Sequence, residues 1–337
     1  MVVRIAVIGG GINGLACAVK IKEKYYNAQV VVISSEFSPN TTGDGSAGLW
    51  YPYLCGDTPG ELLSKWGCES YSFLHQRWRE GGQAVCLMPI YSLYRDKSRW
   101  TKPSWADDVF GYHKLNEKEL EYYSELFSGK FAAGHIFTTF TFWPPPFLNY
   151  LQARFLEANG EVLQATVKSL QDPILNGFHV IINCTGLGAK ELIRDDAVFP
   201  YRGQVIRVKA PWVMETVMDE DDGKYIIPNA NTCVLGGTRQ QHNYNTKLDE
   251  NDTASILNGC HNILPSLKSA ELYSQWVGLR PGRQSVRLEA EEKYGRLIIH
   301  NYGHGGCGLT LFWGCATNVV QLLDSRMGGI IKDKCKL

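Results

Sequence analysis

The chain has 337 residues, with 34 basic and 34 acidic side chains, so its formal net charge at neutral pH is zero. This balance gives no electrostatic footprint for a nucleic-acid partner, and a charged ligand has to be met by a local cluster of side chains. Hydrophobic residues make up 44% and charged residues 20% of the sequence, which indicates a globular chain with room for two domains. A run of about 18 apolar residues is absent, so we expect no membrane-spanning helix and no membrane partner.

Ten cysteines are scattered along the chain. They form neither a Cys-x-x-Cys pair nor a Cys/His pattern with the spacing of metal ligands, so we expect no metal site. Dispersed cysteines of this kind are typical of free thiols in a reducing compartment.

The N-terminus predicts a strand–helix–strand unit. Arg4–Ile8 is a β-branched strand, residues 15–25 have helical spacing of apolar positions, and Gln29–Ser34 is a second buried strand. The first apolar stretch runs directly into a glycine-rich turn and not into a small-residue cleavage site, so we interpret it as a strand and not as a signal peptide.

The turn between the first strand and the helix has the pattern Gly9-x-Gly11-x-x-Gly14. In this context the first glycine permits a tight turn, the second lets the backbone approach a pyrophosphate, and the third allows close packing of helix on strand. The helix N-terminus, with the amides of Ile12 and Asn13, adds N–H donors and a partial positive charge. Ser35 and Glu36 end the second strand, where an acidic residue is expected for the ribose hydroxyls, although Glu36 stands one place late.

The remaining chain is predicted to alternate strands and helices, without an internal repeat or a low-complexity linker. We expect a polar loop at 37–48, a hairpin turn at 229–231, helices at 61–80, 147–159, 252–264 and 309–323, and strands at 162–170, 179–183, 199–209, 224–227, 232–235 and 296–300. Elements of the nucleotide-binding type lie at both chain ends and in the middle, which favours interleaved domains.

Several motifs, in the same order along nearly the whole chain, resemble the D-amino acid oxidase family. They are Val7-Ile8-Gly9-Gly10-Gly11, Thr41-Thr42, Ala47-Gly48-Leu49-Trp50, Asn183-Cys184-Thr185-Gly186, Arg202-Gly203-Gln204, Gly278-Leu279-Arg280-Pro281 and Asn301-Tyr302-Gly303-His304-Gly305-Gly306. Within that family, Gly236-Gly237-Thr238-Arg239-Gln240 is similar to the D-aspartate oxidase branch.

The resemblance implies an α/β fold, in which a Rossmann-like FAD-binding domain is interleaved with a substrate domain built on a mainly antiparallel sheet. We assign residues 1–50, 140–190 and 285–337 to the FAD-binding domain, and residues 51–139 and 191–284 to the substrate domain.

The resemblance also implies FAD as the cofactor. By motif match, the FAD-contacting residues are Gly9, Gly11, Ile12, Asn13, Gly14, Ser35, Glu36, Thr41, Thr42, Ala47, Gly48, Leu49, Val167, Gly305, Gly306, Gly308, Leu309 and Thr310. Val167 is expected to contact the adenosine part through its backbone, and residues 305–310 are expected to wrap the flavin ring.

Four residues are expected at the substrate. Arg280 offers a planar fork of donors for the α-carboxylate, and the family places the hydroxyl of Tyr225 on the same group. The carbonyl of Gly306 is expected to accept a hydrogen bond from the amine. Arg239 is expected to be a second buried cation, which meets a side-chain carboxylate and disfavours neutral substrates.

The sequence departs from the family pattern in three places. Tyr51 and Tyr53 occupy a lid-side stretch, and Cys307 stands where other members often carry an aromatic residue. The run Asp219–Asp222 is acidic where the mammalian-type D-aspartate oxidases carry an arginine. This run puts a second side-chain anchor in doubt and is compatible with a wider pocket that accepts D-glutamate.

The implied chemistry is transfer of the Cα hydrogen as hydride to the flavin, with oxygen as final acceptor. The products are a 2-oxo acid, ammonia and hydrogen peroxide. His304 is interpreted as part of the loop scaffold and not as an acid or base. Two other interpretations stay open: an oxidase of neutral D-amino acids or glycine, with Arg239 facing solvent, and a flavin-binding protein without turnover.

The chain ends in Cys335-Lys336-Leu337, a loosened form of the Ser-Lys-Leu peroxisomal address. We therefore expect a peroxisomal import receptor as partner and a peroxisomal location, with the cytoplasm as the alternative. Peroxide production gives a reason for such an address.

Overall fold

The computed structural model of the chain describes residues 2–82 and 85–334, so the C-terminal tripeptide lies outside the described residues. One of its two sheets has six strands in the order β14-β15-β7-β1-β2-β6. The neighbouring strands are parallel except for the antiparallel pair β14 and β15. The bounds are β1 Arg4–Ile8, β2 Gln29–Ser34, β6 Glu161–Gln164, β7 Val180–Asn183, β14 Arg287–Lys293 and β15 Arg296–Tyr302.

The two faces of this sheet bury alternate residues of its central strands, as strand geometry requires. Ile5 and Val7 pack in the core cluster that also holds residues of the helices α1 (Ile12–Lys24), α2 (Gly60–Arg79), α4 (Pro144–Glu157) and α7 (Gly308–Lys334). Ala6 and Ile8 pack on the opposite face. The opposite core is completed by Leu170, Leu175, Phe178 and Leu192.

The second sheet has nine strands, in the order β12-β8-β11-β10-β9-β3-β5-β4, with β13 paired to β8. All of its pairings are antiparallel except that of β3 with β9. The bounds are β3 Val85–Tyr94, β4 Phe110–Lys114, β5 Ala133–Phe142, β8 Phe199–Lys209, β9 Thr216–Asp219, β10 Lys224–Pro228, β11 Cys233–Gly236, β12 Gln240–Gln241 and β13 Glu271–Gly282. The predicted fold class, a parallel Rossmann-like sheet with a mainly antiparallel second sheet, is confirmed.

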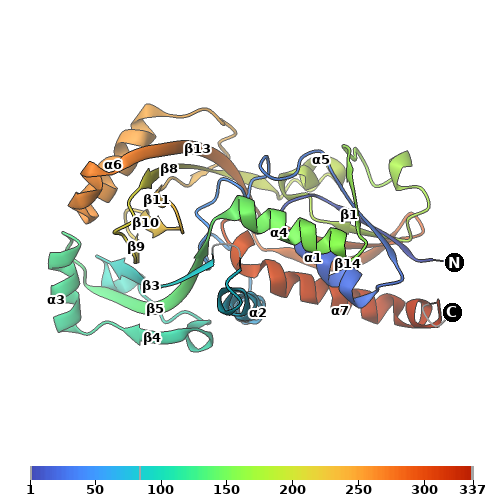
Figure 1. Cartoon of the computed structure of the whole chain (residues 1–337), viewed down its shortest axis with the longest axis horizontal. Coiled ribbons are helices and arrows are strands. Elements are labelled where there is room, and N and C mark those ends of the chain that lie inside the picture. Colours follow the sequence, from blue (N-terminus) through green and yellow to red (C-terminus); the bar gives the residue numbers. More distant parts are fainter. Residues whose placement is uncertain (1, 83–84, 335–337) are drawn as a thin grey trace.

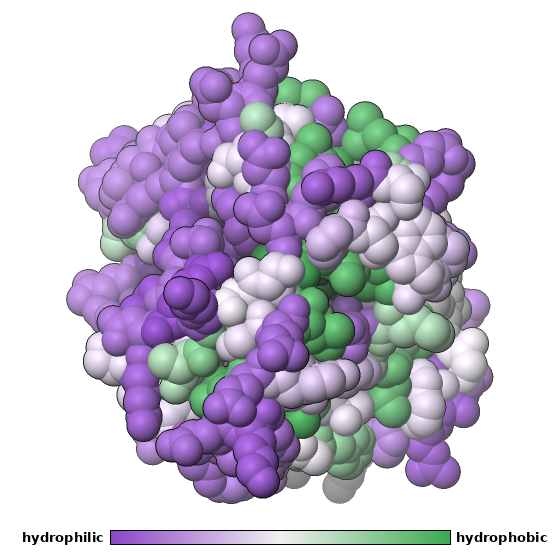
Figure 2. Space-filling view, turned by 90° about the vertical axis from the view of Figure 1, so that its left-hand side faces the viewer, coloured by the Kyte–Doolittle hydropathy of each residue, from purple (hydrophilic) through white to green (hydrophobic). Residues whose placement is uncertain are grey.

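Three further helices accompany the sheets: α3 (Glu117–Leu126), α5 (Ala189–Leu192) and α6 (Glu250–Ile263). The antiparallel sheet, with α3 and α6, forms one end of the molecule, and the parallel sheet with α1, α4 and α7 forms the other (Figure 1). Hydrophilic side chains cover most of the end that carries α3 and α6, with apolar side chains between them (Figure 2). None of the helices in the described part of the chain is long and apolar enough to cross a membrane.

The chain passes between the two sheets several times, so the sheets are interleaved in sequence. Strands of the parallel sheet fall within the predicted segments 1–50, 140–190 and 285–337. Strands of the second sheet fall within 51–139 and 191–284, apart from β5, which continues to Phe142. The domain limits themselves stay a prediction.

Candidate active site

A cavity of about 430 Å³ begins at the carboxyl ends of the parallel strands and extends to the second sheet. Ligands of open α/β sheets bind outside the carboxyl ends of the strands, and this cavity lies there. Its first part is lined by the segments that follow β1, β2 and β7. Its far part is lined by Gly203 and Val205 of β8, Met218 of β9, Tyr225 and Ile227 of β10, and Trp276, Gly278 and Arg280 of β13.

The three glycines of the first turn have three different surroundings. Gly9 has a φ of 115°, and a Cβ there would stand 2.5 Å from the carbonyl oxygen of Cys184. A Cβ on Gly14 would stand 1.9 Å from the carbonyl oxygen of Gly9, so the third glycine serves helix–strand packing. A Cβ on Gly11 would meet nothing within 4 Å, and Gly11 lines the cavity. The second glycine therefore leaves room for a ligand, as a pyrophosphate-binding turn requires.

The N-terminus of α1 opens onto the same space. No side chain caps this helix, and its first turn carries no acidic residue. Ile12 and Asn13 line the cavity. Free N–H groups and the positive end of the helix dipole thus face the cavity, an arrangement that binds phosphate.

Ser35 and Glu36 line the end of the cavity beyond β2. Glu36 is exposed, and its carboxylate accepts a hydrogen bond of 3.3 Å from the side chain of Asn40. The contact of Glu36 with the ribose stays a prediction.

The loop of residues 41–49 forms the next part of the wall, and Thr41, Thr42, Ala47, Gly48 and Leu49 all line the cavity. Arg207 of β8 fixes this loop to the second sheet. It is 6% exposed and donates to the carbonyl oxygen of Ser46 at 2.6 Å and to the side chain of Asn229 at 2.9 Å. Asn229 in turn donates to the carbonyl oxygen of Ala47 at 3.1 Å.

The opposite wall is the segment before and within the first turn of α7. Gly305, Gly306, Gly308 and Leu309 line the cavity, as predicted for the flavin-binding segment. A Cβ on Gly306 would stand 2.7 Å from the carbonyl oxygen of Tyr53, so the backbone passes close beside that residue.

Three predicted cofactor residues do not line the cavity: Gly14, Val167 and Thr310. Thr310 is fully buried, and its hydroxyl accepts from the backbone N–H of Tyr51 at 3.1 Å and donates to the carbonyl oxygen of Tyr51 at 2.8 Å. The hydrogen-bonding groups of this side chain are therefore occupied within the protein. Val167 packs against the core beyond the outer face of the parallel sheet.

His304 and Asn13 face each other across the cavity wall, with 3.4 Å between His304 Nδ1 and Asn13 Nδ2. His304 Nε2 and Asn13 Oδ1 are buried without a hydrogen-bond partner in the described structure. Burial lowers the pKa of His304 to about 4, so the ring is neutral at pH 7. Buried polar atoms without partners at a cavity wall are expected where a polar ligand satisfies them. Together with the glycine turn and the free helix N-terminus, they fit FAD.

The far end of the cavity holds Arg280 and Tyr225. Arg280 lies flat on β8, because a Cβ on Gly203 would be only 2.1 Å from its Nη1 atom. Its Nη1 donates to the carbonyl oxygen of Thr238 at 3.0 Å. Tyr225 is 6% exposed. Burial raises the pKa of its hydroxyl, and the positive charge of Arg280 partly offsets that rise.

No carboxylate forms an ion pair with Arg280 among the residues that the structure describes. If Arg280 had a purely structural role, we would expect a carboxylate of the same domain to pair with it, and the described chain provides none. A half-buried guanidinium without a counter-ion, beside a tyrosine hydroxyl, is a receptor for an anion, and its planar fork suits a carboxylate.

The exposure of the Arg239 side chain differs from the prediction. It is exposed and does not line the cavity, so the expected second buried cation is wrong as regards burial. The reason is its position just before β12, a two-residue strand at the sheet edge. Arg239 nevertheless lies beside the turn between β9 and β10, since a Cβ on Gly223 would stand 4.0 Å from its Cζ atom, and its charge acts on Tyr53, which lines the cavity. Burial raises the pKa of the Tyr53 hydroxyl, and the charges of Arg280 and Arg239 both lower it.

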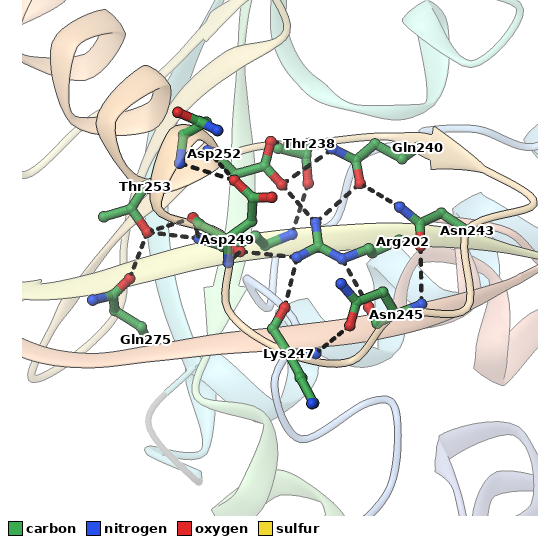
Figure 3. A network of polar contacts seen from close by, with 12 residues as sticks. Arg202, Thr238, Gln240, Asn243, Asn245, Lys247, Asp249, Asp252, Thr253 and Gln275 are labelled. Carbon is green, nitrogen blue, oxygen red and sulfur yellow. Dashed lines mark hydrogen bonds and ion pairs between the residues drawn. The ribbon is translucent and has the colours of Figure 1, made fainter.

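The backbone that carries Arg239 is fixed by a polar network centred on Arg202 (Figure 3). Arg202 is 1% exposed, forms an ion pair of 2.6 Å with Asp252 and donates to Gln240 at 3.0 Å. On the other side of Arg239, the hydroxyl of Thr238 accepts from the backbone N–H of Gln204 at 2.8 Å. Both neighbours of Arg239 are therefore held, which places its side chain at the rim of the cavity.

Other residues at the far end of the cavity were not singled out from the sequence. Met218 and Trp276 line its apolar part. Apolar side chains of this kind are common in the core of any domain, so a single sequence carries no signal that separates them from core residues. The described residues contain no group of three His, Cys, Asp or Glu side chains that would hold a metal ion.

Residues 4–322 match the protein family described as FAD dependent oxidoreductase. The chain is 39% identical to a D-amino acid oxidase of Dugesia ryukyuensis, with 95% of this chain and 97% of that protein covered. It is 35% identical to the D-aspartate oxidase of Homo sapiens, with 95% and 94% covered.

Solved structures support the same fold. The glycine oxidase of Bacillus cereus has a TM-score of 0.77 at 19% identity, covering 96% of this chain and 95% of that chain. The L-alpha-glycerophosphate oxidase of Mycoplasma pneumoniae, solved with FAD bound, has a TM-score of 0.79 at 14% identity, covering 96% and 95%. The fold, the cavity and these relatives agree, and the chain belongs to the D-amino acid oxidase family of FAD-dependent oxidoreductases.

Proposed function

We propose that the chain is an FAD-dependent oxidase of D-amino acids, and that acidic ones, D-aspartate or D-glutamate, are preferred. The overall reaction converts a D-amino acid, oxygen and water to a 2-oxo acid, ammonia and hydrogen peroxide. The observation that carries the proposal is Arg280, a guanidinium without a carboxylate partner in the described chain, at the end of a cavity whose other end fits FAD.

In the proposed mechanism, Arg280 and the hydroxyl of Tyr225 bind the α-carboxylate. The carbonyl oxygen of Gly306, on the opposite wall, accepts a hydrogen bond from the amine. FAD, when bound, supplies the hydride acceptor and the reactivity with oxygen. The protein contributes mainly orientation, which can lower a barrier by up to about 7–11 kcal/mol when the reacting groups are well placed.

The cavity offers no evident general base at this end. Burial raises the pKa values of Tyr51, Tyr53 and Tyr225, so their hydroxyls keep their protons at neutral pH. His304 is neutral, but its Nδ1 is occupied by Asn13 and it belongs to the wall predicted to hold FAD. We therefore expect the substrate amine to react in its neutral form, having lost its proton to solvent before the hydride leaves.

The acidic preference rests on Arg239 and Tyr53. With Arg280 on the α-carboxylate, a side-chain carboxylate that points to the rim meets the charge of Arg239 and the hydroxyl of Tyr53. Oxidation of neutral D-amino acids is the second candidate. Exposure of Arg239 favours it, because a hydrated cation loses less when it has no partner than a buried one.

Anaerobic reduction of the purified yellow protein by a panel of D- and L-amino acids tests both candidates. Bleaching of the flavin by D-aspartate and not by L-aspartate is expected. Bleaching by D-alanine but not by D-aspartate would transfer the proposal to neutral substrates. A flavin that no amino acid reduces would support binding without turnover.

We also propose that the C-terminal tripeptide Cys335-Lys336-Leu337 is bound by the peroxisomal import receptor. Deletion of the three residues is expected to disperse the protein from peroxisomes and to leave its activity unchanged. An unaltered distribution would leave the cytoplasm as the expected location.

A further inference from the structure

The acidic turn between β9 and β10 divides into two parts with different partners. Arg95 forms ion pairs with Asp219 and Asp222, and Arg99 forms one with Asp221. Three of the four carboxylates are thus engaged by arginines from the segment around η1 (Lys97–Arg99).

Glu220, the fourth, is directed to the wall of the substrate end instead. Its carboxylate accepts hydrogen bonds from the hydroxyl of Tyr51 at 2.6 Å and from the hydroxyl of Ser92 at 3.2 Å. Ser92 is fully buried, and its hydroxyl oxygen lies 3.1 Å from that of Tyr51, so its single proton serves either the Glu220 carboxylate or the Tyr51 oxygen. Tyr51 lines the cavity, so Glu220 stands directly behind its wall.

Glu220 is electrostatically coupled to the residues that face the substrate side chain. Burial raises the pKa of its carboxyl, whereas its two hydroxyl donors and the charges of Arg239 and Arg99 lower it. Its charge also raises the pKa of the Tyr53 hydroxyl. Arg239 lies over the turn that carries Glu220, because a Cβ on Gly223 would stand 4.0 Å from the Cζ atom of Arg239. No ion pair joins Glu220 and Arg239 in the described structure, because the carboxylate is held by Tyr51 and Ser92.

A negative charge on Glu220 opposes the binding of a second negative charge, the side-chain carboxylate of an acidic substrate. Once ionised, Glu220 reduces the positive potential that Arg239 offers to a side-chain carboxylate, and the burial of its own carboxylate behind Tyr51 limits screening by water on that side. The other ionisable groups around it are Tyr51, Tyr53 and Tyr94, whose pKa values burial raises, so they remain neutral.

We propose that Glu220 is a specificity-determining residue, held by Tyr51 and Ser92, that weakens the attraction of Arg239 for an acidic substrate side chain. Glu220 acts through Arg239 and is a positioning residue and not a catalytic one. The inference rests on the proposed function, since it assumes that the substrate side chain reaches the rim at Arg239.

Glu220→Gln in the holoenzyme is the primary test, because glutamine keeps an oxygen that accepts from Tyr51 and Ser92 while the charge is removed. The KM for D-aspartate is expected to fall about tenfold at alkaline pH, and that for D-alanine to change less than about twofold. As the pH falls through the raised pKa of Glu220, the carboxyl is protonated and the difference between wild type and variant is expected to vanish.

The matched control is Asp222→Asn, which removes one charge from the same turn. Asp222 is exposed and paired with Arg95, so both KM values are expected to change less than about twofold. Ser92→Ala is the second variant. It removes one anchor of Glu220, lets the carboxylate move toward Arg239, and is expected to raise the KM for D-aspartate selectively.

Binding of succinate and propionate, followed by the absorbance change of the bound flavin, repeats the comparison without turnover. Succinate is expected to bind Glu220→Gln more tightly than wild type, and propionate equally. Equal shifts for both ligands, or weaker succinate binding, would overturn the role of Glu220. If the wild-type holoenzyme binds these carboxylates but no D-amino acid reduces its flavin, the proposed function fails. The role of Glu220 is then decided by the succinate result alone.

Discussion

Substitution of Gly11 by alanine separates cofactor binding from folding. A Cβ at Gly11 meets no protein atom within 4 Å, and its φ of −79° and ψ of −179° are accessible to alanine. Alanine restricts the unfolded chain more than glycine does, which stabilises the folded variant by about 0.4–1 kcal/mol. Alanine is also a poorer N-cap than glycine, and this loss cancels a similar amount. We therefore expect the apoprotein to unfold at nearly the wild-type temperature.

The added methyl group would project into the cavity, where the pyrophosphate of FAD is expected to touch the backbone. Overpacking of this kind costs about 1–3 kcal/mol, so the Kd for FAD is expected to rise by roughly 10- to 100-fold. Gly14→Ala is the matched control. Its Cβ would lie 1.9 Å from the carbonyl oxygen of Gly9, so this variant should lose stability in the apoprotein as well.

Titration of each apoprotein with FAD, followed by quenching of flavin fluorescence, measures the Kd, and thermal unfolding without FAD measures stability. Tight FAD binding by Gly11→Ala would refute the assignment of the glycine turn to the pyrophosphate. A strongly destabilised Gly11→Ala apoprotein would contradict the open space beside this residue.

Three further predictions follow from other parts of the site and core. Arg280→Met is expected to lower kcat/KM for every D-amino acid by at least about 100-fold while FAD stays bound, because the cation expected to bind the α-carboxylate is lost. A loss confined to acidic substrates would contradict this role. Arg207→Met removes the hydrogen bond to the carbonyl oxygen of Ser46 that fixes the 41–49 loop, so apoprotein titrations should show weaker FAD binding. An affinity equal to that of wild type would contradict this role of Arg207. Burial lowers the pKa of His135 to about 4, so between pH 6.5 and 4 the unfolded state binds the proton that the folded state does not. The free energy of unfolding should therefore fall by about 3 kcal/mol across this range as the pH falls, and urea titrations of His135→Phe should lack this component.

The sequence predicted the parts of the fold in which a local pattern is sufficient. Arg4–Ile8, Gln29–Ser34 and Phe199–Lys209 are strands with the predicted bounds. The first two are runs rich in β-branched and apolar residues next to a turn. The strand predicted at 162–170 ends at Gln164 in the structure. Only Glu161–Gln164, an exposed edge strand, pairs with β2.

Strands β3, β5 and β13 were not predicted, although they are among the longest in the structure. β13 is partly exposed and contains the Gly-Leu-Arg-Pro motif, so its residues show neither strict alternation nor a continuous apolar run. Its identity as a strand comes from pairing with β8 over nearly the whole length of both. Pairing between segments more than 60 residues apart leaves no local signature in either of them.

The site residues, too, could be predicted where a local sequence pattern is sufficient and not where their positions depend on distant segments. The glycine turn was predicted from the backbone geometry that a pyrophosphate-binding turn requires, and the segment before α7 from its resemblance to the family motif; both line the cavity. The exposure of Arg239 depends on the sheet edge at β12, and the position of Glu220 depends on Tyr51 and Ser92 from two other segments. Such properties arise only when distant elements are packed together.

The substrate end also shows why glycines recur in the motifs beside its polar side chains. A Cβ on Gly203 would lie 2.1 Å from Arg280 Nη1, and one on Gly236 would lie 2.1 Å from the ring of Tyr225. Both side chains therefore lie against strand backbone that carries no side chain of its own, and the charge of Arg280 acts on the Tyr225 hydroxyl. The atoms that an alanine would displace belong to the side chains expected to bind the α-carboxylate, and not to the backbone of the fold. The glycines of Arg202-Gly203-Gln204 and Gly236-Gly237-Thr238 are thus steric counterparts of Arg280 and Tyr225, and the geometry of the carboxylate site is encoded in the strands beneath it as much as in the two residues that bind.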